Sequence, residues 1–144
     1  MLRLAIVVAV FFTTTSAFAQ GPSFTPVNAS DRQEIAKVIL GQMAAFKAEN
    51  GDAAFAFSAP NVRAKFGSSE TFMKMIRKNY EPVYNPRSVE FGALSISHVG
   101  PVQHVFVLDP NAVAFVALYL MERGDDGRWQ IAGCILRPRE AREA

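Results

Sequence analysis

The side chains that could perform acid–base chemistry are few in this sequence, and the most promising are its three tyrosines. Tyr80 ends a predicted helix, Tyr84 lies between two prolines, and Tyr119 lies in the middle of a predicted strand. Each combines an apolar ring with a hydroxyl that needs a hydrogen-bond partner when it is buried. With Gln42 and His104 they form the polar set that we expect in a mostly aromatic pocket. The alternative is that each tyrosine only packs in the core.

Gln42 and His104 are polar side chains that the sequence pattern places among apolar ones. Gln42 lies within the apolar stripe of a predicted helix, where a buried amide must find partners in a polar pocket or on sheet backbone. His104 alternates with Val102 and Phe106, so it is predicted to face an apolar side, where burial would keep the imidazole neutral. A neutral imidazole could act as an acid or a base. A core histidine with satisfied hydrogen bonds is the alternative.

Known catalytic and metal-binding motifs are absent from the sequence. It contains no Gly-x-Ser-x-Gly elbow, no phosphate-binding glycine loop and no paired-histidine motif. The two histidines and the single cysteine are far apart, which argues against a metal site. Only Arg137 is a nearby cation for Cys134, so this cysteine is predicted to be a small buried hydrophobic residue and not a reactive thiol. We therefore predict no catalytic set, no metal and no cofactor.

The first nineteen residues have the pattern of a secretory signal peptide. Arg3 supplies the positive start, residues 4–12 form an apolar run, and Ala17-Phe18-Ala19 is a small-x-small cleavage site. The run is shorter than the roughly 20 apolar residues that a membrane span needs. We predict cleavage after Ala19, a periplasmic or secreted protein, and no membrane span after cleavage. An uncleaved anchor is the alternative.

Charge and length limit the class of protein. The 15 basic and 13 acidic residues give a formal net charge of +2, and the basic ones are scattered, so we predict no nucleic-acid binding. A chain of 144 residues suggests one domain. We divide it into a signal peptide (1–19), a flexible lead-in (20–29), a single α+β domain (30–138) and a C-terminal tail (139–144).

The first half of the chain has the spacing and the capping residues of helices. Ser30 followed by Gln33 predicts a capping box at the start of a helix that ends near Asn50. The capping and stop signals of the shorter helices that follow are Asp52, Pro60, Gly67, and Ser68 or Ser69.

After Pro86 the period of the apolar residues changes to two, which predicts strands. The four runs cover residues 89–96, 102–108, 113–122 and 129–136. Helices followed by a strand meander predict an α+β fold, with N-terminal helices packed on an antiparallel sheet of about four strands. Gly92 and Gly133 lie inside strand runs, where glycine marks a bulge or bend, so we expect the sheet to be strongly curved.

The run over residues 113–122 is apolar on both faces. An antiparallel strand with one face in water would alternate apolar and polar residues. We therefore expect one face to meet the helices and the other to meet a partner, for example in a homodimer through the sheet face, or to line a dry cavity. The alternative is a central strand buried on both sides within one monomer.

The segment between the helices and the strands contains two prolines, Pro82 and Pro86. Proline disfavours helix for the residue before it, so Glu81 and Asn85 are predicted to be extended. We predict a stiff structural joint that sets the angle of the first strand, with Arg87 anchoring it to a carboxylate or to helix carbonyls.

A set of short motifs extends in order through nearly the whole chain after the predicted signal. They are Gln42-Met-Ala-Ala-Phe46, Asp52-Ala-Ala-Phe55, Ser58-Ala-Pro60, Phe66-Gly67, Tyr80-Glu-Pro-Val-Tyr84-Asn-Pro86-Arg87, Phe91-Gly92, Gly127-Arg-Trp129 and Gly133-Cys134. With these motifs the sequence resembles the family known as domain of unknown function 4864, small and mostly exported bacterial proteins within the nuclear-transport-factor-2-like (SnoaL-like, cystatin-like) superfamily. The resemblance implies a cone in which a curved sheet cups the helices, and it implies no activity.

The wider superfamily contains isomerases, cyclases and dehydratases as well as non-catalytic binding modules, and a fold does not decide among them. The isomerase pattern needs an aspartate base beside an acid–tyrosine pair, and we identify no aspartate at an inward-facing strand position. We therefore expect a non-catalytic module that binds a small apolar ligand or a partner. The alternatives are an isomerase, dehydratase or cyclase that uses a pocket tyrosine or histidine, and a structural dimeric accessory protein of the envelope.

Overall fold

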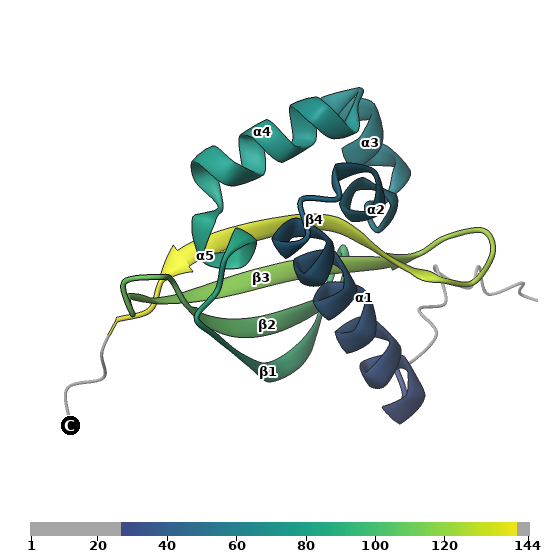
Figure 1. Cartoon of the computed structure of the whole chain (residues 1–144). Coiled ribbons are helices and arrows are strands. Elements are labelled where there is room, and N and C mark those ends of the chain that lie inside the picture. The colour runs from purple at the N-terminus through teal and green to yellow at the C-terminus, as the bar shows by residue number, and fades with distance from the viewer. Residues whose placement is uncertain (1–26, 141–144) are drawn as a thin grey trace, which may run out of the picture.

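The computed structural model describes residues 27–140, which form helices first and strands afterwards (Figure 1). The elements are α1 (Ala29–Lys47), α2 (Gly51–Ala56), α3 (Pro60–Phe66), α4 (Ser69–Asn79), α5 (Glu81–Tyr84), β1 (Ser88–Ser97), β2 (Gly100–Leu108), β3 (Ala114–Arg123) and β4 (Trp129–Pro138). The predicted signal peptide, its cleavage site, most of the lead-in and the end of the tail lie outside the described residues. No helix within residues 27–140 is long and apolar enough to cross a membrane.

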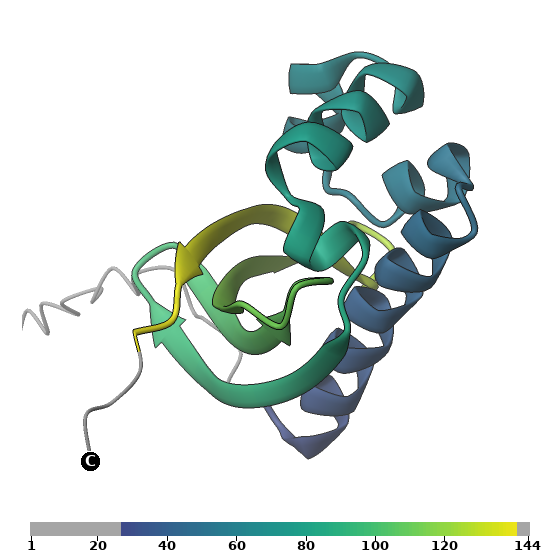
Figure 2. The same cartoon turned by 60° about the vertical axis from the view of Figure 1, so that its left-hand side comes forward.

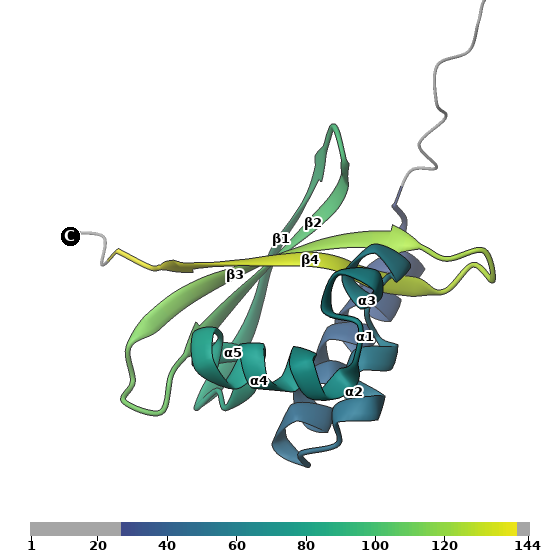
Figure 3. The same cartoon turned by 90° about the horizontal axis from the view of Figure 1, so that it is seen from above.

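The four strands form one antiparallel sheet in the order β1-β2-β3-β4, as a meander (Figure 3). Figure 3 also shows that the helices all lie on one face of this sheet. The predicted α+β class and the four-stranded antiparallel sheet are therefore confirmed. The opposite face, which we call the outer face, carries no helix of the described chain.

Two irregularities interrupt the strand pairing, and both lie at or beside the glycines that predicted them. The β1–β2 register shifts between Phe91 and Leu94, and a Cβ on Gly92 would lie 2.6 Å from the Phe106 ring, so a larger residue there would force that ring to move. The β3–β4 register shifts between Leu120 and Met121, opposite the β4 segment that contains Gly133. The sheet stays open, because β1 and β4 do not pair. The strong curvature stays a prediction.

Apolar side chains gather in two clusters. The larger cluster lies between α1, α5 and the helix-covered face of the sheet, and it includes Trp129. The smaller cluster lies among α1, α2 and α4 and is rich in phenylalanine, with Phe46 and Phe72 ring centroids 6.1 Å apart. Figure 2 shows α2, α3 and α4 gathered at the C-terminal end of α1, beside β4. The second cluster thus builds a helical layer above one edge of the sheet.

The caps of the first two helices differ from the predicted ones. Asn28, not Ser30, caps α1, and its capping-box partner is Asp31. Asn50, not Asp52, caps α2. In both cases another side chain able to cap lay within two residues, and local sequence does not decide between neighbouring candidates. The predicted stop at Gly67 and the cap at Ser68 are confirmed.

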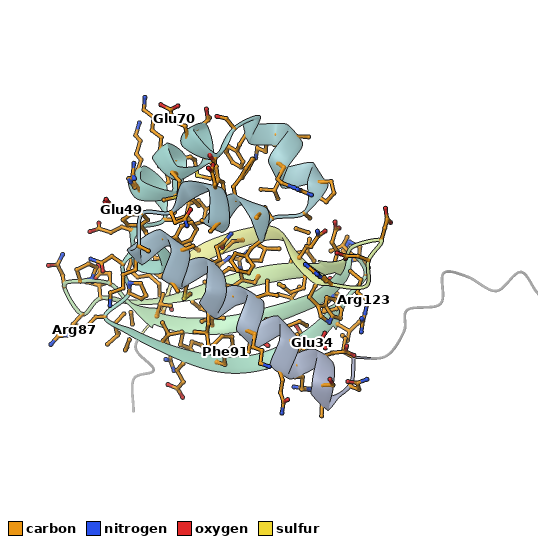
Figure 4. The ribbon with its side chains drawn as sticks, turned by 45° about the vertical axis from the view of Figure 1, so that its right-hand side comes forward. Glu34, Glu49, Glu70, Arg87, Phe91 and Arg123 are labelled. Carbon is orange, nitrogen blue, oxygen red and sulfur yellow. The ribbon has the colours of Figure 1, made fainter. Side chains whose placement is uncertain are left out.

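The proline-containing segment forms the short helix α5 and then turns into β1. Glu81 begins this helix, which corrects the prediction of extended geometry there, because a proline in the first helical turn needs no N–H partner. Pro82 is buried, while Pro86 lies between Asn85 and the first strand. Arg87 is exposed at the end of the sheet away from the start of α1 (Figure 4). Its backbone N–H donates to the Leu108 carbonyl (2.8 Å), but within residues 27–140 its side chain makes no hydrogen bond or ion pair.

Candidate functional site

A pocket of about 480 Å³ lies between the helical layer and β4. Its volume falls in the range of roughly 300–1,000 Å³ that is usual for small-molecule sites. Its lining comes from α1, α3, α4, the α2–α3 connection and β4: Gln42, Ser58, Asn61, Val62, Lys65, Phe66, Phe72, Met75, Ile76, Tyr80, Ile131, Ala132, Gly133 and Cys134. A second hollow, of about 340 Å³, has four exposed charged side chains among its eight lining residues, so it is the weaker candidate for an apolar ligand.

Gln42 lies on the sheet-facing side of α1 and is only 4% exposed. Its Nε2 donates to the Ala54 carbonyl of α2 at 3.2 Å, which satisfies one of the amide's hydrogen bonds. Its Oε1 accepts no hydrogen bond from residues 27–140. The side chain therefore holds α1 and α2 together and still presents an acceptor at the pocket wall.

Ser58 is the most enclosed polar residue of the pocket, at 1% exposed. Its Oγ has no hydrogen-bond partner within the described residues. The backbone around it pairs with β4: the Ala59 N–H donates to the Ile131 carbonyl (2.8 Å), and the Ile131 N–H donates to the Phe57 carbonyl (2.9 Å). The chain is thus held in place while the serine hydroxyl is left free. Sequence reasoning missed this residue, although it lies in the Ser58-Ala-Pro60 motif.

Tyr80 and Cys134 form the far wall of the pocket. The Tyr80 hydroxyl donates to the Cys134 carbonyl at 3.0 Å, and burial raises the pKa of this tyrosine. Burial raises the pKa of the Cys134 thiol to about 12, so at neutral pH it is protonated and a poor nucleophile.

Tyr119 pairs with Cys134 across β3 and β4 and is 1% exposed. Its hydroxyl has no hydrogen-bond partner among the described residues, and burial, together with the neighbouring thiol of Cys134, raises its pKa well above the usual value. The residue belongs to the core beneath the pocket and does not line it.

Tyr84 lies in the helical layer, away from the pocket lining. Its hydroxyl accepts a hydrogen bond from Arg77 Nε (3.2 Å) and lies 3.5 Å from Glu49 Oε1, and its ring lies 5.9 Å from that of Phe46. Its polar end is thus held by exposed charged side chains. Of the five residues grouped by sequence, the structure brings only Gln42 and Tyr80 into one pocket.

His104 lies on the outer face of the sheet, opposite Leu118. Its neighbours along β2 on the other face, Gln103 and Val105, are buried under the helices. His104 is therefore separated from Gln42 by the sheet itself, and the two cannot act on one bound molecule. Alternation along β2 predicted its apolar surroundings correctly but not which face the helices cover.

No helix of the described residues covers the outer face, whose middle is mostly apolar although Glu90, His104 and Arg137 also lie on it. Its half-buried or exposed side chains include Val102, Phe106, Val116, Leu118, Leu120 and Ile135. Within residues 27–140 the third strand is therefore not covered on both faces, because the described helices all lie on the other face.

A second buried polar cluster lies at the opposite end of α1. Asp31, 4% exposed, accepts hydrogen bonds from the Asn28 backbone N–H (2.9 Å) and from Trp129 Nε1 (3.3 Å), and it pairs with Arg123. The Asn28 N–H is the main reason that the pKa of this carboxyl lies below its usual value, with Trp129 and Arg123 lowering it further. Figure 4 shows Arg123 at the end of the sheet where α1 begins. Sequence reasoning missed this cluster, because its members are more than 90 residues apart.

Within residues 27–140, no group of three or more histidine, cysteine, aspartate or glutamate side chains is placed to hold a metal ion. The polar side chains of the pocket lining are the amides of Gln42 and Asn61, the Ser58 hydroxyl, the exposed Lys65 ammonium, and Tyr80, whose hydroxyl already has a partner. This donor set suits hydrogen bonding to a bound molecule more than proton transfer.

The sequence matches the family described as "Domain of unknown function (DUF4864)" over residues 28–144. The chain belongs to this family. The DUF4864 match covers the described helices and strands together, so the pocket and the Asp31 cluster both lie inside the family domain. No curated protein matches the sequence at the level of significance applied.

Proposed function

We propose that this DUF4864 protein binds a small, mostly apolar molecule in the pocket between the helical layer and β4, without chemistry. The observation that carries the proposal is the Ser58 hydroxyl, which is buried at the pocket wall without a partner. A buried polar group left unpaired costs about 1–3 kcal/mol. A ligand oxygen that reached Ser58 would recover that free energy, and the apolar walls would enclose the rest of the ligand.

The proposal extends to the wider relationship and the location of the protein. We propose that the domain belongs to the nuclear-transport-factor-2-like superfamily, as a cone whose helices lie over one face of a curved sheet. The helix-first order and the single covered face support this assignment. The signal-like residues 1–19 support a periplasmic or secreted location.

The enzymatic alternative has less support. An isomerase, dehydratase or cyclase needs an acid and a base on one bound molecule. The hydroxyl of Tyr80 is held by the Cys134 carbonyl, and His104 lies beyond the sheet. Within residues 27–140, Tyr80 and His104 therefore do not form such a pair at the pocket.

The test is binding of N-phenyl-1-naphthylamine, a neutral apolar probe whose fluorescence rises in apolar surroundings. We expect saturable binding to the purified protein. Val62→Trp fills the pocket and is expected to weaken probe binding at least about tenfold, or about 1.4 kcal/mol. Val99→Trp, at an exposed turn away from the pocket, is the matched control and is expected to leave the affinity unchanged. Equal affinities for both variants, or no saturable binding, would refute the proposal.

A second candidate is a homodimer that buries the outer face. The six apolar side chains of that face support it, since contiguous exposed apolar patches mark interaction sites. A two-fold dimer would place the same patch against itself. We expect wild-type protein to sediment as a dimer and Leu118→Glu as a monomer, while Leu40→Glu, on the exposed side of α1, stays dimeric. A wild-type monomer at high concentration would eliminate this candidate.

A further inference from the structure

The pocket has one charged residue in its lining, and that residue is a cation. Within the described part of the chain, Lys65 of α3 lines the pocket without any acidic residue beside it in the lining. Lys65 is exposed, and its Nζ lies 5.6 Å from the centre of the Phe66 ring. It forms no ion pair with residues 27–140. Its charge is therefore free at the mouth of the pocket.

The uncharged polar groups of the pocket lie at its enclosed side. Ser58 and Gln42 are 1% and 4% exposed, whereas Lys65 is exposed, so burial orders the three residues from the interior to the mouth. At the interior, Ser58 Oγ is free to donate or accept, and Gln42 Oε1 is free to accept. A ligand hydroxyl would suit both atoms, because it can donate to one and accept from the other.

The wall between these two ends is apolar. It is made by aliphatic and aromatic side chains, namely Val62, Phe66, Phe72, Met75, Ile76 and Ile131. These residues provide no hydrogen bond to a ligand, so the middle of a ligand must be hydrocarbon to be enclosed without cost.

We propose that the ligand is an anionic amphiphile, a monocarboxylate whose apolar body carries a hydroxyl at the far end. Its carboxylate pairs with Lys65 at the mouth, its body lies along the apolar wall, and its hydroxyl bonds to Ser58 and Gln42. This inference rests on the proposed function, because it names the chemistry of the molecule that the same pocket binds.

The experiment compares three compounds with the same ten-carbon acyl chain as competitors of the neutral probe: methyl decanoate, decanoate and ω-hydroxydecanoate. Methyl decanoate is neutral and has no hydroxyl, so we expect decanoate to bind about two- to fivefold more tightly, as for an exposed ion pair, and this advantage to fall as salt is raised. We expect the ω-hydroxyl to add a further factor of about three to ten, as for one hydrogen bond.

Two variants with one control assign each contribution to a residue. Lys65→Gln should remove the advantage of decanoate over methyl decanoate and leave methyl decanoate binding unchanged. Ser58→Ala should remove the advantage of ω-hydroxydecanoate over decanoate and leave decanoate unchanged. Lys78→Gln, an exposed lysine of α4 outside the pocket lining, should change none of the three affinities. Melting temperatures of all variants verify that each is folded.

The outcomes separate this inference from the proposed function. If methyl decanoate competes as well as decanoate and Lys65→Gln changes neither, the anionic ligand is refuted while apolar binding in the pocket stands. If Ser58→Ala weakens decanoate and ω-hydroxydecanoate equally, the proposed orientation is refuted. If the probe itself does not bind, the proposed function fails, and this inference fails with it.

Discussion

Asp31 and Ser58 are both buried polar residues beside β4, and they differ in whether their hydrogen bonds are made. Asp31 has three partners, from Asn28, Trp129 and Arg123. Ser58 Oγ has none within the described residues, although it is the more enclosed of the two. Satisfied buried polar groups stabilise a fold, whereas an unsatisfied one lowers stability unless a bound molecule completes it. The difference separates a stabilising polar cluster at one end of α1 from the wall of the proposed binding pocket at the other.

The largest expected effect is on stability, when the polar cluster around Asp31 is disrupted. Asp31→Ala removes the capping-box carboxylate of α1 and leaves Arg123 and Trp129 without their partner. We expect the melting temperature to fall by about 5 °C or more, measured by circular dichroism. Asp31→Asn keeps an acceptor in place and should fall between Asp31→Ala and wild type. A melting temperature equal to wild type for Asp31→Ala would show that the cluster does not stabilise the fold.

The pH dependence of stability should follow from the same carboxyl. Its pKa is lower in the folded protein, so the stabilisation is complete above the unfolded-state pKa of about 3.9 and is lost as the pH falls below that value. We expect the urea midpoint of wild-type protein to drop between pH 5 and pH 3 more steeply than that of Asp31→Asn. Parallel curves for the two proteins would contradict this role of Asp31.

Gln42 is intermediate between Asp31 and Ser58. Its Nε2 donates a hydrogen bond to the Ala54 carbonyl, whereas its Oε1 accepts none from residues 27–140. Gln42→Met keeps the volume and removes the bond to the Ala54 carbonyl, so we expect the free energy of unfolding to fall by about 1–2 kcal/mol in urea titrations. Lys37→Met, on the exposed side of the same helix, is the control and should stay near wild type. A loss as small as that of the control would show that the bond between α1 and α2 contributes little.

The smallest expected effect is that of Ser58→Ala. The substitution removes a hydroxyl that has no partner, so we expect the free energy of unfolding to stay within about 1 kcal/mol of wild type, unchanged or slightly raised. Urea titration of the ligand-free protein measures it. A clear loss of stability would mean that the hydroxyl is bonded in the folded protein, and the contrast with Asp31 would disappear.

Much of the fold could be predicted from local patterns. The change of apolar period after Pro86 located the strands, and Gly67, Ser68 and Gly92 marked a helix end, a helix start and a bulge that the structure confirms. These features depend on a few neighbouring residues and on backbone geometry, which act the same way in any fold. The neighbouring caps at Asn28 and Asn50 were missed because adjacent side chains could serve equally well.

The candidate site could be predicted only in part. Gln42 was identified because an amide within an apolar helix stripe requires an explanation. Ser58 was not, because the residues around it in the sequence are the same as those around any serine that precedes a helix, and they do not reveal that its hydroxyl is buried without a partner.

By itself, the sequence determined the order of helices and strands, the turns between them and the alternation along each strand. Only the tertiary structure decided that the helices cover the face of Gln103 and Val105, which leaves His104 outside and away from the pocket. It likewise brought Asp31 to Arg123 and Ser58 to Ile131. The physical reason is that alternation divides a strand into two faces without choosing between them, and that choice depends on packing between segments far apart in the chain.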